Sequence, residues 1–109
     1  MTIKKLLAAI HSDLSLDSAE EIKANIELIA RVQEMSAGER ETIKAAFSDG
    51  SLYDGDVPSK SSRDILVKDG FIAKVVVKGE DGFNACTYKG RWAYRILKAM
   101  IEAQEPAND

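Results

Sequence analysis

The sequence predicts an α+β protein that is mostly helical and carries one β-hairpin in its second half. Two patterns lead to this fold class. Apolar residues recur at spacings of three and four over much of the 109 residues, as they do on amphipathic helices. Residues 71–78 and 83–88 are instead rich in β-branched and aromatic side chains and flank a glycine-bounded reversal. We divide the chain into N-terminal helices at 1–35, a main domain at 36–104 and a polar tail at 105–109.

Two helices are expected before residue 36. Apolar residues have helical spacing within residues 2–12, which Thr2 can cap. A second helix begins at Ser18, because Ser18-Ala19-Glu20-Glu21 has the form of a capping box. Its apolar residues make two adjacent stripes, which indicates burial against more than one neighbour. This helix either packs on its own domain or forms a homodimer interface, whose residues would be Ile22, Ile26, Ile29 and Gln33.

A third helix is expected to begin at a second capping box, Ser36-Ala37-Gly38-Glu39, and to end near Phe47 with Gly50 as a left-handed cap. Residues 48–57 are rich in turn formers and are predicted to be a loop. The loop holds Asp49, Asp54 and Asp56, but it lacks the alternating ligands and terminal glutamate of a calcium loop. Turn chemistry explains these aspartates, and no metal is expected.

A fourth helix is predicted at 58–69, where Pro58 suits the first turn. Gly70 would end it. We expect Ile65 and Leu66 to face inward, together with Ser62. The residues expected to face solvent are Lys60, Arg63, Asp64 and Lys68.

The hairpin follows. Strand alternation places Lys74 and Lys78 on one face of the first strand. The opposite face is predicted to be the core side and holds Phe71, Ala73, Val75 and Val77. Thr87 can then cap a closing helix, whose apolar face would include Trp92, Ile96, Leu97, Met100 and Ile101.

Charge is distributed unevenly along the chain. The formal net charge is −3, which by itself does not favour a nucleic-acid partner. Residues 58–98, however, hold nine basic and four acidic side chains, whereas residues 1–57 hold six basic and eleven acidic ones. Such a basic segment either solvates a small domain or meets an anionic partner, and the asymmetry favours the partner.

Two short motifs flank the hairpin: Leu66-Val67-Lys68-Asp69-Gly70-Phe71-Ile72 before it and Thr87-Tyr88-Lys89-Gly90-Arg91 after it. In these motifs and their order the chain, over Ser36 to Met100, resembles the winged-helix fold of MarR-type and related small regulators. Chains of this build also resemble bacteriophage or prophage products. The resemblance implies a winged helix-turn-helix-like domain with two extra N-terminal helices and a two-stranded β-hairpin wing. One departure is the short link 50–57, where the family has a separate helix; here a loop or a single turn replaces it.

The function implied by the resemblance is a transcription regulator that binds double-stranded DNA through helix 58–69 and the wing at 71–88. Basic and hydroxyl side chains on such a helix can bond base edges in the major groove, and wing contacts to phosphate position the protein. The alternative is a protein–protein interaction module that keeps the winged-helix shape without binding DNA, such as a phage-type accessory or inhibitor protein. The expected DNA-binding residues are Lys60, Ser61, Ser62, Arg63, Lys68, Lys74, Lys78, Lys89 and Arg91.

No catalytic site or cofactor is expected. His11 is the only histidine and suits a helix surface, and Cys86 is interpreted as a small core residue because no histidine lies near it in sequence. A single cysteine excludes an internal disulfide and fits the reducing cytoplasm. No apolar run approaches the roughly 20 residues that a membrane helix needs, so no membrane partner is expected.

Overall fold

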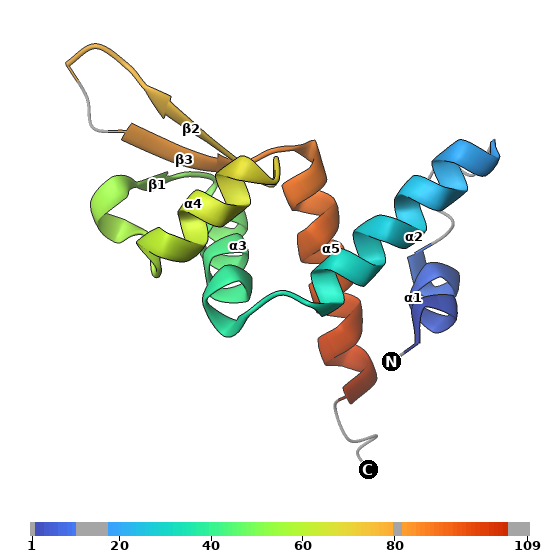
Figure 1. Ribbon diagram of the computed structural model, residues 1–109. Coiled ribbons are helices and arrows are strands. Elements are labelled where there is room, and N and C mark those ends of the chain that lie inside the picture. The colour runs from blue at the N-terminus through green and yellow to red at the C-terminus, as the bar shows by residue number, and fades with distance from the viewer. Residues whose placement is uncertain (1, 11–17, 80–81, 105–109) are drawn as a thin grey trace. The chain divides into compact units, whose positions relative to one another are not determined.

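The computed structural model describes residues 2–10, 18–79 and 82–104. Over these residues the chain is α+β and mostly helical, with five α-helices and a three-stranded antiparallel sheet (Figure 1). None of the described helices is both long and apolar enough to cross a membrane. The elements in chain order are α1 (Ile3–Ile10), α2 (Ala19–Gln33), α3 (Ala37–Asp49), β1 (Leu52–Tyr53), the 3₁₀ turn η2 (Asp54–Asp56), α4 (Lys60–Lys68), β2 (Ile72–Val76), β3 (Gly82–Cys86) and α5 (Tyr88–Gln104).

The chain forms two compact units. The first comprises Met1–Glu34 and Arg95–Asp109, and the second comprises Met35–Tyr94. The first therefore holds α1, α2 and the later part of α5, whereas the second holds every strand together with α3, η2, α4 and the start of α5. The buried apolar side chains of the first unit are Leu6, Ile10, Ile29, Val32, Ile96, Leu97 and Met100.

The capping signals predicted from the sequence form as expected. The Ser18 hydroxyl accepts from the Glu21 amide at 3.1 Å, and α2 begins directly after it. At α3 the capping box is complete, because Ser36 accepts from the Glu39 amide and the Glu39 carboxylate accepts from the Ser36 amide. Gly50 follows the end of α3 with φ +79°, a conformation that glycine adopts without a steric cost.

The sheet has the strand order β1-β3-β2, so the predicted hairpin is confirmed and gains a third strand. β1 pairs with β3 through Leu52 opposite Asn84 and Tyr53 opposite Phe83. β2 pairs with the other edge of β3, from Ile72 opposite Cys86 to Val76 opposite Gly82. β1 lies within the predicted loop 48–57, because two residues are too few to show an alternating pattern.

The predicted core side of β2 is wrong. Phe71, just before the strand, is fully buried, but Val75 and Val77 are 51% and 49% exposed. Exposure instead rises along the strand, from 2% at Ile72 to 71% at Val76. The hairpin extends beyond the helices that pack on its base (Figure 1). The burial of a β2 side chain therefore depends on how far along the strand it lies. A sheet covered along its whole length would instead show buried and exposed side chains in alternation.

The junction between the sheet and α5 explains the second motif of the sequence. The Thr87 hydroxyl accepts from the Gly90 amide at 3.1 Å, which confirms Thr87 as the cap. The same hydroxyl bonds the Gly70 carbonyl at 2.6 Å. A Cβ at Gly90 would collide with the Phe71 carbonyl oxygen, so only glycine lets the first turn of α5 approach the start of β2 this closely. Threonine and glycine together fix where α5 leaves the sheet.

Candidate nucleic-acid interface

Helix α4 is the element on which a nucleic-acid interface would depend. It begins at Lys60, two residues later than predicted, and its cap is Ser59, whose hydroxyl accepts from the Ser62 amide at 3.2 Å. Ser59 and Ser62 also bond each other through their hydroxyls at 2.9 Å. A Cβ at Gly38 of α3 would lie 2.5 Å from the Ser62 hydroxyl oxygen. Ser62 is thus buried, and the start of α4 packs closely on the start of α3.

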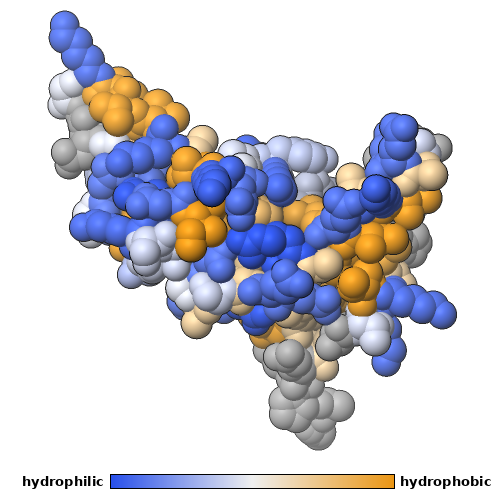
Figure 2. All heavy atoms as spheres, in the orientation of Figure 1, coloured by the Kyte–Doolittle hydropathy of each residue, from blue (hydrophilic) through white to orange (hydrophobic). Residues whose placement is uncertain are grey.

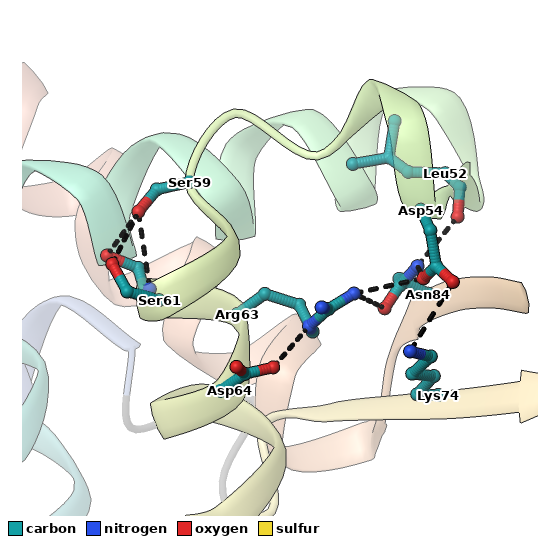
Figure 3. Close-up of polar contacts among 9 residues, drawn as sticks. Leu52, Asp54, Ser59, Ser61, Arg63, Asp64, Lys74 and Asn84 are labelled. Atoms are coloured by element: carbon teal, nitrogen blue, oxygen red, sulfur yellow. Dashed lines mark hydrogen bonds and ion pairs between the residues drawn. The ribbon is translucent and has the colours of Figure 1, made fainter.

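Arg63 lies in a buried polar cluster and does not face solvent as predicted (Figure 3). Its residue exposure is 7%. One terminal nitrogen donates to Asp54 Oδ1 at 3.0 Å and to Asn84 Oδ1 at 3.1 Å, and Nε donates to Asp64 Oδ1 at 2.7 Å. The prediction that Arg63 faces outward is wrong, because its guanidinium bonds three partners in its own chain, and two of them are distant in sequence.

Asn84 and Asp54 complete this cluster, which ties five elements together. The Asn84 amide donates to Asp54 Oδ1 at 2.8 Å and to the Leu52 carbonyl at 3.1 Å. Lys74 of β2 lies 3.4 Å from Asp54 Oδ2 (Figure 3). The sheet, η2 and α4 are therefore connected through the Asp54 carboxylate.

The electrostatics of Asp54 follow from these contacts. The hydrogen bond from Asn84 lowers the pKa of Asp54 below its ordinary value of 3.8, and the positive charges of Lys74 and Arg63 act in the same direction. Partial burial opposes this shift. No buried side-chain nitrogen or oxygen among the described residues lacks a partner, so the cluster is fully satisfied.

The exposed face of α4 holds a different set of side chains. Lys60, Ser61, Asp64, Ile65 and Lys68 recur at helical spacing, and all five are exposed. Ile65 is 48% exposed, so the prediction that it faces inward is wrong. Asp64 keeps an ion pair with Arg63, which partly neutralises the one acid on this face. Ile65 is apolar and adjacent to Leu66, so the sequence alone favours a core position for it.

The remaining predicted DNA-binding residues fall into two groups. Lys78 and Arg91 are exposed. Lys74 and Lys89 already have partners within the chain. Lys74 pairs with Asp54, whereas the Lys89 ammonium donates to the Asp69 carbonyl at 2.8 Å and lies 4.5 Å from the centre of the Phe71 ring. To contact a DNA phosphate, each of these two lysines would have to give up its partner within the chain.

The predicted dimer face lies on α2. Ile29 is fully buried in its own chain, and Ile22 and Gln33 are half-buried. Ile26 is the most accessible of the four, at 36%. A second copy docking on α2 would therefore meet Ile26 first, and the homodimer stays a prediction.

Cys86 has the environment of a packed side chain. It is half-buried, its sulfur lies 3.7 Å from the Ile43 carbonyl oxygen, and burial raises the pKa of the thiol to about 11. A protonated thiol is a poor nucleophile. His11 lies outside the described residues, and within them no group of three or more acidic, histidine or cysteine side chains is placed to hold a metal ion.

A scan against protein-family models finds no match, and searches of curated proteins and of solved structures likewise find no similar protein.

Proposed function

We propose that this chain binds duplex DNA as a winged-helix-like protein in which α4 enters the major groove. The order α3, β1, η2, α4, β2, β3 supports the proposal, with η2 in the place of the family's middle helix. A single 3₁₀ turn can do this because the Asp54 cluster, rather than a second packed helix, holds α4 against the sheet. Transcription regulation is the role that such binding would serve.

The exposed face of α4 is the observation that carries this proposal. Lys60, Ser61 and Lys68 can donate to base edges or phosphate oxygens. Ile65 offers an apolar surface of the kind that contacts a thymine methyl group. The buried face of the same helix is fixed by Leu66, Ser62 and Arg63, so the outer side chains project from a rigid support.

The proposed DNA contacts involve fewer residues than the sequence predicts. Arg63 and Ser62 support the helix instead of reading DNA, because both are buried. Lys78 and Arg91 are the exposed cations that would contact the backbone beside α4.

The proposal is tested by paired charge removal. We expect Lys60→Ala with Lys68→Ala to weaken binding to a mixed-sequence duplex roughly tenfold or more at low salt, and to reduce the slope of log K against log salt by about 2. The control is Lys4→Ala with Lys5→Ala, which removes the same charge from α1 and should change affinity less than about twofold. Fluorescence anisotropy measures both. Equal losses in the two variants, or no duplex binding at low salt, would contradict the proposal.

A protein–protein interaction module is the second candidate, and the wing favours it. Val75, Val76 and Val77 are all about half exposed or more, and Figure 2 shows hydrophobic atoms gathered over the hairpin at the upper left. Apolar side chains in such a position are typical of protein contacts rather than phosphate contacts. If the chain is such a module, Lys60→Ala with Lys68→Ala should leave binding to the protein partner intact, whereas Val76→Ser should abolish that binding. Cross-linking of a purified partner to the hairpin measures the difference.

A further inference from the structure

Strand β2 is an open edge of the sheet. The strand order β1-β3-β2 leaves its outer side without a partner strand among the described residues. Proteins commonly protect such edges with charges, proline or a bulge. The one charged residue within β2 is Lys74, and its ammonium is drawn to Asp54 at 3.4 Å. The edge is therefore weakly protected.

The sheet face beside this edge is apolar and uncharged. Tyr53, Phe83 and Val75 lie opposite one another across the three strands, and Ala73 lies opposite Ala85. The Tyr53 and Phe83 rings are 5.0 Å apart, and Tyr53 is 44% exposed. A strand added at β2 would extend this face.

We infer that the occupant of the β2 edge is the same strand of a second copy of this chain, paired antiparallel and centred on Val75. An antiparallel pair related by a two-fold axis has one residue opposite itself. If the two-fold axis passed through Lys74, the Lys74 side chains of the two copies would lie opposite each other. If it passed through Val76, Lys74 of each copy would lie opposite Lys78 of the other. Like charges directly opposite one another are destabilising.

The Val75 register avoids this repulsion. Val75 lies opposite Val75 of the second copy, Ala73 opposite Val77, and Lys74 opposite Val76. Ala73, Val75 and Val77 of both copies then share one sheet face, and every lysine lies opposite an apolar residue. This self-complementarity favours a second copy over an unrelated extended segment. Two edge strands cover less surface than the roughly 1,200 Å² of a stable interface, so the dimer should be weak.

The first experiment uses opposite charges at the centre of the pair, on the full chain without DNA. Sedimentation velocity over a wide concentration range should show reversible dimerisation of the unaltered chain. Val75→Lys alone and Val75→Glu alone should each abolish it, and mixing the two variants should restore a dimer. Ile65→Lys on α4 is the matched control, because Ile65 is 48% exposed and Val75 is 51% exposed. It should dimerise like the unaltered chain.

A cysteine pair tests the register. In oxidising buffer Val75→Cys should form a cross-linked dimer, since opposite Cα atoms lie about 5 Å apart. Val77→Cys should not, because the two copies of residue 77 would be about 14 Å apart along the strand. A monomer at all concentrations, a dimer insensitive to both charge variants, failure of the mixture to associate, or equal cross-linking of both cysteines would overturn the inference. None of these outcomes depends on whether α4 binds DNA.

Discussion

Arg63 illustrates, at the scale of single residues, how a charge can be misassigned from helical spacing. Its position between Ser62 and Asp64 says only that it lies near the boundary of the buried face. Its burial depends on Asn84 and Asp54, which are 21 and 9 residues away in the chain. No local pattern shows that these three residues meet, so the sequence alone predicts Arg63 as a DNA contact. Ser18 and Ser36, by contrast, cap their helices by accepting from amides three residues away, and their capping boxes predict this correctly.

The effects of substitutions on stability should distinguish a structural basic residue of α4, Arg63, from a surface one, Lys60. Arg63→Ala should lower the free energy of unfolding by about 2 kcal/mol, because it leaves the buried Asn84 side-chain oxygen without its donor and removes the Arg63–Asp54 ion pair. Lys60→Ala, at an exposed position, should change it by less than about 0.5 kcal/mol. Denaturant titration followed by circular dichroism measures both, and equal effects would show that Arg63 is not structural.

The depressed pKa of Asp54 gives a pH dependence with a definite sign. A carboxyl whose pKa is lower when folded contributes stability above its unfolded pKa, near 3.8, and loses it as pH falls through the folded value. Asp54→Asn should therefore be less stable than the unaltered chain at neutral pH, and this difference should shrink below about pH 4. Denaturant titrations at several pH values measure it. A difference that stays constant down to pH 2 would contradict the assigned role.

At the scale of elements, the sequence predicted the five helices and the hairpin but not the way the hairpin is covered. The capping boxes at Ser18 and Ser36, together with the glycines at 50 and 70, mark helix ends that the structure confirms. The valines of β2 were assigned to a core because β-branched runs usually lie in covered sheets. Here the helices cover only the base of the hairpin (Figure 1), which is a property of tertiary packing and not of the strand's own pattern.

The junction of β2 and α5 gives a prediction at this scale. Gly90→Ala should destabilise the chain by about 3 kcal/mol, because the new methyl group collides with the Phe71 carbonyl and must separate α5 from the sheet. Gly55→Ala is the control: no atom lies within 4 Å of the added carbon, and a change of less than about 1 kcal/mol is expected. Thermal and denaturant unfolding measure both. A well-tolerated alanine at position 90 would show that this contact does not fix the junction.

At the scale of the whole molecule, folding redistributes the charge asymmetry seen along the sequence. The basic stretch 58–98 shares its compact unit with the acids of α3 and the turn, so Met35–Tyr94 holds nine basic and nine acidic residues. A unit without net charge cannot attract DNA through its overall field. The proposed DNA binding would then depend on the few cations that are exposed on α4 and near the wing.

A modest salt dependence follows from this balance. If Lys60, Lys68, Lys78 and Arg91 each neutralise one phosphate, log K should fall against log salt with a slope of about −3.5. A fluorescence titration at several salt concentrations measures the slope. A value steeper than about −6 would require cations beyond these four, and would show that the exposed set is incomplete.

The most direct test of the account is to map where duplex DNA touches the chain. A mixed-sequence duplex is titrated into isotope-labelled protein at low salt, and backbone amide shifts are followed by NMR. We predict that the changes concentrate on α4, at Lys60, Ser61, Ile65 and Lys68, and extend to Lys78 and Arg91 while sparing α1 and α2. An unchanged spectrum, or changes confined to residues away from α4, would contradict the proposal that α4 is a DNA-reading helix.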